Sequence, residues 1–263
     1  MQRSFTDMTG RKIGIPYPPK RIVSLVPSQT ELLYDLGLDA EVVGITKFCV
    51  HPESWFRTKT RIGGTKTVHL DRVRALQPDL IIANKEENTR EQVEALAMDF
   101  PVWISNIQTV DEGLQMILGI GDLTCTAAMA AELITAISKG FSQLPGSSLP
   151  RNVAYFIWKD PWMCAGGDTF INDIIFRMGW RNVLAGQMRY PEVSPQMLAD
   201  AGVDLVLLSS EPYPFKEKHI AEISKILPAA KILLVDGEMF SWYGSRMLKA
   251  VSYLSDFLTR SEP

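Results

Sequence analysis

The sequence predicts an α/β protein whose two halves each contain a mostly parallel sheet. Short apolar runs rich in β-branched residues recur along the chain, and a helical pattern follows most of them. Such alternation of strand and helix is typical of parallel sheets. A helical region at residues 110–144 separates the two series, and the turn-forming segment PGSSLP at residues 145–150 marks the clearest boundary. Two α/β halves around a central helix predict a ligand cleft between them.

Composition excludes several classes of protein. The 263 residues are 46% hydrophobic and 22% charged, which is ordinary for a globular protein with substantial cores. The formal net charge of −3 argues against a nucleic-acid-binding protein. The sequence contains no run of 18 apolar residues, so no transmembrane helix is expected.

The N-terminal segment, MQRSFTDMTGRKIGIPYPPK, lacks the apolar core and cleavage site of a signal peptide. It predicts instead a short hairpin in which FTDM and KIGI flank a turn at Thr9 and Gly10.

The first βα unit is predicted within KRIVSLVPSQTE, residues 20–31. Arg21–Val26 is an apolar, β-branched run that favours a buried strand, and Pro27 ends it. Ser28 and Glu31 have the spacing of a capping box, which predicts a helix from Ser28 to about Gly37. A helix that begins where a strand ends presents backbone N–H groups at the carboxyl edge of the sheet, where open α/β folds bind ligands.

The remaining elements follow the same logic. Further strands of the first half are expected at Glu41–Ile45, Asp79–Ala83 and Val102–Ser105, and helices at Leu70–Gln77 and Asn88–Asp99. Gly119 and Gly121 divide the central region into two predicted helices, the second at Thr124–Leu144 with a length of about 30 Å. In the second half, strands are expected at Asn152–Trp158, Asp204–Ser209 and Lys231–Val235, and helices at Thr169–Gly179, Ser194–Ala201, Lys216–Lys225 and Ser245–Thr259.

No metal or catalytic motif stands out. Cys49, Cys125 and Cys164 form no CxxC pair and are odd in number, so a disulfide framework is not expected. Cys49 and His51 are two residues apart, but no second cluster supplies further ligands for zinc.

Motifs of the common hydrolases and nucleotide-binding enzymes are also missing, since the chain has no GxSxG, HExxH or P-loop. Glu211, Asp236 and Glu238 follow predicted strands and stay open as general bases, although acids are common at strand ends without catalysis.

Four segments resemble one family in the right order: PKRIVSLVPSQTELLYDLG, HLDRVRALQPDLIIA, SPQMLADAGVDLVLL and DGEMFSWYGSRM. The family is that of the class III periplasmic binding proteins, the cobalamin, ferric-siderophore and haem receptors of ABC importers. The resemblance implies two Rossmann-like lobes joined by a long, rigid connecting helix. It divides the chain into an N-terminal lobe at residues 1–122, the connecting helix at 123–145 and a C-terminal lobe at 146–263.

Candidate ligand-binding residues lie at strand ends and in the loops that follow strands. Seven of them are aromatic: Phe48, Trp55, Trp158, Trp162, Phe240, Trp242 and Tyr243. Any one of these could instead pack on its own core, but the set favours a lined, mostly apolar cleft. The polar candidates are Ser28, Gln29, Lys66, Asn84, Lys85, Lys159, Tyr190 and Arg246. The resemblance leaves open whether Arg246 contacts the ligand or braces its loop.

The resemblance also implies one exposed acid on each lobe that meets arginines of a permease. Asp71 matches the first position, whereas Gln196 stands where the family has Glu, and the nearby Glu192 is the substitute. A helix-capping Asp and a surface Gln are the alternative interpretation.

The predicted function is therefore that of a substrate-binding component of an ABC importer, not an enzyme. The expected ligand is a corrinoid ahead of a ferric siderophore or haem, with any metal already held by the chelator and no other cofactor. Tyr190, Tyr243 and His51 are the only plausible axial ligands. The alternatives are a cytoplasmic chelate carrier or sensor and an enzyme that acts on a tetrapyrrole. The expected partners are the chelate and a permease, with no nucleic acid, and a monomeric chain. An extracytoplasmic location is expected if a leader was trimmed, and a cytoplasmic one if Met1 is the native start.

Overall fold

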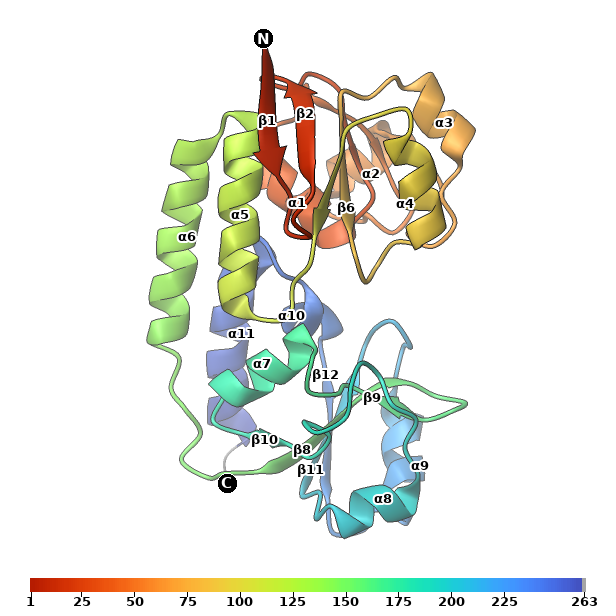
Figure 1. Cartoon of the computed structure of the whole chain (residues 1–263). Helices are drawn as coiled ribbons and strands as arrows, with labels where there is room; N and C mark the ends of the chain where they lie inside the picture. Colours follow the sequence, from red (N-terminus) through yellow and green to blue (C-terminus); the bar gives the residue numbers. More distant parts are fainter. Residues whose placement is uncertain (262–263) are drawn as a thin grey trace. The chain divides into compact units, whose positions relative to one another are not determined.

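The computed structural model describes residues 1–261, and its elements are shown in Figure 1. By their internal contacts the residues form two compact units. Unit 1 comprises residues 1–107, 111–136 and 243–246, and unit 2 comprises residues 108–110, 137–242 and the chain from Met247 onward. The boundaries at residues 122 and 145 stay a prediction. The contacts place Tyr243–Arg246, from late in the sequence, in unit 1.

The predicted N-terminal hairpin is present as β1 (Gln2–Thr6) and β2 (Lys12–Pro16), which pair antiparallel. Its turn is held by Asp7, whose Oδ1 accepts hydrogen bonds from the backbone N–H groups of Thr9 and Arg11, each at 2.9 Å. Burial raises the pKa of the Asp7 carboxyl, but the hydrogen bonds from Thr9 and Arg11 outweigh this and lower it overall.

Unit 1 contains a five-stranded parallel sheet in the order β5-β4-β3-β6-β7. Its strands are β3 (Ile22–Ser24), β4 (Val42–Ile45), β5 (Thr60–Arg61), β6 (Leu80–Asn84) and β7 (Val102–Ser105). Every residue of β6 is buried, as expected for a strand covered on both faces. The chain runs from β3 to β4 and β5 on one side, and from β6 to β7 on the other. The topological switch point, where such folds bind ligands, therefore lies between β3 and β6.

The helices of this unit are α1 (Pro27–Asp35), α2 (Glu53–Thr58), α3 (Leu70–Ala75) and α4 (Arg90–Ala97). The predicted capping box at Ser28 and Glu31 is wrong. Helix α1 begins one residue earlier, with Val26 at the N-cap and no side-chain cap. Pro27 suits the first helical position because its fixed φ matches a helix and its missing N–H leaves no unpaired donor. The Glu31 carboxylate accepts a hydrogen bond from Arg246 instead of capping α1.

Two helices follow, α5 (Val110–Thr124) and α6 (Ala127–Ser142). The predicted interruption at Gly119 and Gly121 is wrong, because both glycines lie inside α5 and the break falls at Cys125, whose φ is +63°. A Cβ on Gly121 would lie 2.5 Å from Cβ of Ala130, so this glycine lets α5 and α6 pack closely. The predicted helix Thr124–Leu144 accordingly starts at Ala127.

The sheet of unit 2 has the order β10-β8-β11-β12, all parallel, and β9 pairs antiparallel with β8. Its strands are β8 (Asn152–Trp158), β9 (Met163–Cys164), β10 (Arg181–Asn182), β11 (Leu205–Ser209) and β12 (Lys231–Val235). Here the strand order reverses between β8 and β11, so this pair marks the second switch point.

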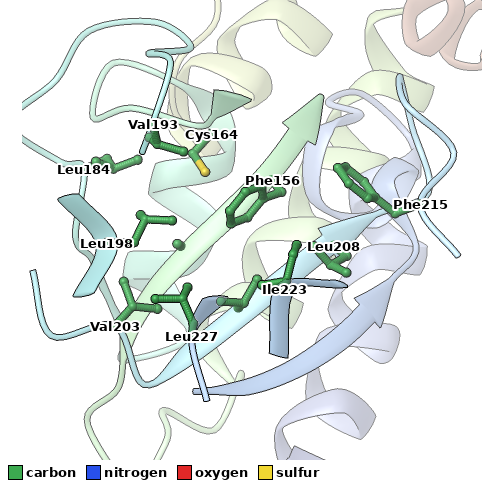
Figure 2. Packing of buried hydrophobic residues seen from close by; sticks show 12 residues of the cluster. Phe156, Cys164, Leu184, Val193, Leu198, Val203, Leu208, Phe215, Ile223 and Leu227 are labelled. Atoms are coloured by element: carbon green, nitrogen blue, oxygen red, sulfur yellow. The ribbon is translucent and has the colours of Figure 1, made fainter. Parts of the chain in front are cut away.

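The helices of unit 2 are α7 (Phe170–Arg177), α8 (Pro195–Asp200), α9 (Glu217–Ile226), α10 (Gly237–Ser241) and all but the first residue of α11 (Arg246–Ser261). Figure 2 shows a buried cluster in which Phe156 of β8, Leu208 of β11 and Ile223 of α9 point toward one another. This cluster packs α9 against the face of the sheet that β8 and β11 form. Within residues 1–261, no helix has the length and apolar character needed to cross a membrane.

Candidate functional site

The switch point of unit 1 gathers four of the predicted polar residues. Ser28 and Gln29 come from the first turn of α1, while Asn84 ends β6 and Lys85 follows it. The side chains of Gln29 and Asn84 bond within the unit. Ser105 Oγ accepts hydrogen bonds from Gln29 Nε2 and, at 3.0 Å, from Asn84 Nδ2. Asn84 Oδ1 in turn accepts from the backbone N–H groups of Glu86 and Glu87 at 2.8 and 3.0 Å, which shapes the loop after β6.

Two further bonds attach Tyr243–Arg246 to this edge. Arg246 Nε donates to Glu31 Oε2 at 2.7 Å, and both side chains are buried. Tyr243 OH donates to Glu87 Oε1 at 2.8 Å. Burial, and then the charge of Glu87, raise the pKa of Tyr243 well above its usual value, so the hydroxyl stays protonated. Of the two roles left open for Arg246, this geometry favours the brace.

The chain at Gly244 passes close to α1. Its φ is +93°, and a Cβ there would lie 3.3 Å from the Ser28 carbonyl oxygen, so glycine suits both the turn and the approach. Among the described residues, Gln29 Oε1 and Ser245 Oγ are buried polar atoms without a hydrogen-bond partner. Such atoms are the acceptors and donors that an ordered water or a ligand would satisfy.

The aromatic candidates of unit 1 have different fates. Phe48 is 50% exposed, and Lys47 Nζ lies 5.0 Å from its ring centre. Trp55, a predicted ligand-binding residue, is 1% exposed in α2 and packs within its own unit. Its ring packs edge-on against Tyr34 at 5.4 Å, and its Nε1 donates to Asp39 Oδ1. Exposed Lys66 donates through Nζ to the Glu86 carbonyl.

The switch point of unit 2 is aromatic. Trp158, the last residue of β8, is 41% exposed, and its ring lies edge-on to that of Tyr213 at 5.7 Å. Tyr213 follows β11, and its backbone N–H donates to the carbonyl oxygen of Ile157 at 3.3 Å. Sequence reasoning missed Tyr213. Its position just after β11 could have found it, because β8 and β11 end at the same edge of the sheet.

Lys159 and Trp162, both predicted to contact the ligand, bond and pack within unit 2. Lys159 Nζ donates to Glu222 Oε1 at 2.7 Å, and this hydrogen bond is the main cause that raises the pKa of Lys159. Trp162 stacks on Phe215 at 6.3 Å with an interplanar angle of 12°, and it packs against the core cluster of Figure 2.

The residues after β12 form the short helix α10 instead of the predicted loop. Phe240, a predicted ligand-binding residue, is fully buried against Tyr155. Trp242 is nearly buried, and its Nε1 donates to Glu211 Oε1 at 2.7 Å. Burial raises the pKa of the Glu211 carboxyl. Asp236 is the N-cap of α10, accepting from the backbone N–H of Glu238 at 3.1 Å, which gives this acid a structural role.

Residues 22–227 match the family described as periplasmic binding protein. The chain belongs to this family. An uncharacterized ABC transporter substrate-binding lipoprotein of Bacillus subtilis is 23% identical over 268 residues, covering 95% of this chain and 83% of that protein. A vitamin B12-binding protein of Vibrio cholerae is 23% identical over 221 residues, covering 82% and 77% respectively.

Solved structures confirm the predicted fold class. The periplasmic haem-binding protein of Vibrio cholerae has a TM-score of 0.77 at 21% identity, with 90% of this chain and 98% of that chain covered. The periplasmic vitamin B12 binding protein of the same organism has a TM-score of 0.75 at 20% identity, with 94% and 100% covered. At these identities the likeness establishes the fold of this periplasmic binding protein and leaves its ligand open.

The predicted docking residues all lie on exposed surface. The Asp71 side chain is 99% exposed at the start of α3, with Arg74 Nη1 3.4 Å from its Oδ1. Glu192 is exposed just before α8. Gln196 is exposed within α8 and donates through Nε2 to Asp200 Oδ1 at 2.6 Å. Ser194 caps this helix, whereas α3 has His69 at its N-cap and no side-chain cap, so Asp71 is not a capping residue.

The three predicted axial ligands differ in how accessible they are to a metal ion. Tyr243 is buried with its hydroxyl on Glu87, whereas Tyr190 and His51 are partly exposed. In the described part of the chain, no three His, Cys, Asp or Glu side chains converge so as to hold a metal ion. Burial raises the pKa of the Cys49 thiol to about 11, so this thiol is protonated at neutral pH.

Proposed function

We propose that this periplasmic binding protein is the extracytoplasmic substrate-binding component of an ABC importer for a metal chelate. A corrinoid is the proposed ligand ahead of a ferric siderophore or haem. Relatives named as vitamin B12-binding and haem-binding proteins support the ligand class. The proposed contact surfaces are the two switch points, with Phe48 and Trp158 as exposed aromatic faces.

The corrinoid ranking rests on one observation: the candidate cations Arg246 and Lys159 are already paired with carboxylates. The positive charge of Arg246 is opposed by the buried Glu31, and that of Lys159 by the partly exposed Glu222. A catecholate siderophore is strongly anionic and requires several available cations, whereas the amide rim of a corrin asks mainly for hydrogen-bonding groups. Aromatic side chains suit a flat macrocycle because they bury a large area and have few rotamers to lose.

Haem ranks lower as a ligand because its iron can require an axial ligand from the protein. A haem receptor that supplies an axial ligand needs an available imidazole or phenol. Of the three candidate axial ligands, Tyr243 meets this need only if it gives up its bond to Glu87, and its raised pKa opposes the phenolate form. The partly exposed Tyr190 and His51 are the candidates that a haem would then have to use.

Titration with four probes tests the ligand. Tryptophan fluorescence is followed while dicyanocobinamide, cyanocobalamin, haemin or a ferric catecholate siderophore is added to the full chain. A corrinoid should bind with a dissociation constant of about 1 μM or tighter, which corresponds to roughly 8 kcal/mol. Tight binding of haemin or the siderophore alone would reverse the ranking. Binding of none would remove the receptor proposal, and chemical conversion of a bound probe would favour an enzyme.

Charge reversal at Asp71 tests the coupling to a permease. Asp71→Arg should leave the affinity for the bound probe unchanged, because this side chain is 99% exposed at the start of α3 and does not follow a strand of the sheet of unit 1. In vesicles that contain the cognate permease, the same variant should abolish uptake. Gln196→Asn is the matched control on α8, because it leaves the charge unaltered. Uptake that survives Asp71→Arg would favour a chelate carrier that works without a permease.

A further inference from the structure

Trp158 and Tyr213 form a pair of aromatic side chains at the switch point of unit 2. The ring of His219 packs against Tyr213. His219 is the third residue of α9 and is only 2% exposed. Its ring centre lies 5.5 Å from that of Tyr213 and 5.4 Å from that of Phe215, edge-on in both cases. A buried histidine whose ring packs on a candidate ligand-binding side chain has no role in the function proposed above.

The hydrogen bonds of His219 define its protonation state. Nδ1 accepts a bond from the backbone N–H of Lys216 at 2.8 Å, so this nitrogen carries no proton. In the neutral ring the proton is then on Nε2, which lies 3.4 Å from Tyr213 OH. His219 thus does what Glu or Gln does at the third position of a capping box, and it touches Tyr213 at the same time.

The geometry points to Tyr213 as a further ligand-binding residue and to His219 as its positioning residue, with chelate affinity that falls when His219 is protonated. This inference rests on the proposed function. A protonated Nδ1 can no longer accept the Lys216 N–H, so the ring must turn. Tyr213 then loses one of the two rings that support it beside Trp158, the other being Phe215 at 4.8 Å.

The surrounding charges fix the direction of the effect. Burial lowers the pKa of His219 below its usual value, and Lys218 and Lys159 lower it further, while Glu222 and the Lys216 bond oppose them. His219 is therefore neutral at pH 7.5, and the support is lost as the pH falls through its lowered pKa. Because a single proton is involved, the affinity should drop by at most about tenfold between pH 7.5 and 5.5.

A fluorine probe tests the pair without any ligand. The full chain carries 5-fluorotryptophan, and the resonance of Trp158 is assigned by its loss in Trp158→Phe. In the unmodified sequence this resonance should shift between pH 7.5 and 5.5. His219→Gln keeps an acceptor for the Lys216 N–H but does not titrate, so the shift should disappear. His69→Gln, at an exposed histidine in unit 1, should leave it intact.

Dicyanocobinamide titrations of the same proteins complete the experiment. His219→Gln should bind equally well at both pH values, and His219→Ala should bind several-fold more weakly at both. A pH-dependent affinity that persists in His219→Gln, or a Trp158 resonance indifferent to pH, would overturn the positioning role. A resonance that follows His219 in a protein that binds none of the four probes would support the positioning role while the proposed function fails.

Discussion

At the switch point of unit 1 polar side chains bond chiefly to one another, whereas at that of unit 2 aromatic side chains stay partly exposed. Ser105 Oγ serves Gln29 and Asn84 at once, and Glu31 holds Arg246. Trp158 instead leaves 41% of its surface open beside Tyr213. The two edges share a strand arrangement and differ in what remains available to a ligand.

The difference has a physical cause. A buried polar group needs a partner, because an unpaired one costs about 1–3 kcal/mol. Gln29 Nε2, Asn84 and Arg246 therefore bond within this crowded edge, while Gln29 Oε1 and Ser245 Oγ are the atoms left there for a water or a ligand. An indole or phenol has no such requirement over its face. Polar residue types at strand ends are therefore weaker indicators of ligand contact than partly exposed aromatic ones.

The largest expected effect concerns the buried pair of unit 1. Arg246→Ala leaves the Glu31 carboxylate buried without its partner, and loss of one member of such a pair costs about 3–5 kcal/mol. The free energy of unfolding should fall by that amount in urea titrations. The double variant Glu31→Leu with Arg246→Met is the control, and it should recover most of the stability because two apolar side chains replace the pair.

A different outcome would break the comparison. If Arg246→Ala keeps its stability but loses affinity for the probe that binds, then Arg246 contacts the ligand. The polar side chains at the switch point of unit 1 would then belong to the binding site.

The next effect separates two tryptophans that the sequence could not tell apart. Trp158→Ala should weaken probe binding by about 1–3 kcal/mol, as expected for an aromatic side chain that stacks on a ligand. Trp55→Phe should lower stability through its lost contacts with Tyr34 and Asp39, with unchanged affinity. Equal affinities in Trp158→Ala and the unmodified protein would remove the aromatic edge of unit 2 from the site.

The contrast between Trp158 and Trp55 also shows how far sequence patterns reach. Strands such as β7, β8 and β12 are predictable to the residue, because a β-branched apolar run has few other uses. Helices α2 and α10 have six and five residues, too few for a helical period to be visible, so Trp55 and Phe240 were placed in loops.

Pairing across long sequence separations was likewise out of reach. Tyr213 meets Trp158 only because β8 and β11 are neighbours in the sheet, and Arg246 meets Glu31 across 215 positions. Strand order is a tertiary property, which local pattern does not encode.

The smallest effect is expected at Lys159, and it tests whether any cation of unit 2 is available to a ligand. The Glu222 side chain is 41% exposed, so solvent screens its ion pair with Lys159, and such pairs contribute about 0–1 kcal/mol. Lys159→Met and Glu222→Gln should each change the free energy of unfolding within that range. The dissociation constant of the bound probe should change by less than about threefold in both variants, since a cation that is already paired contributes little to the binding free energy. If Lys159→Met instead loses affinity about tenfold while Glu222→Gln gains it, the lysine exchanges its carboxylate for the ligand. An anionic chelate would then rank above the corrinoid.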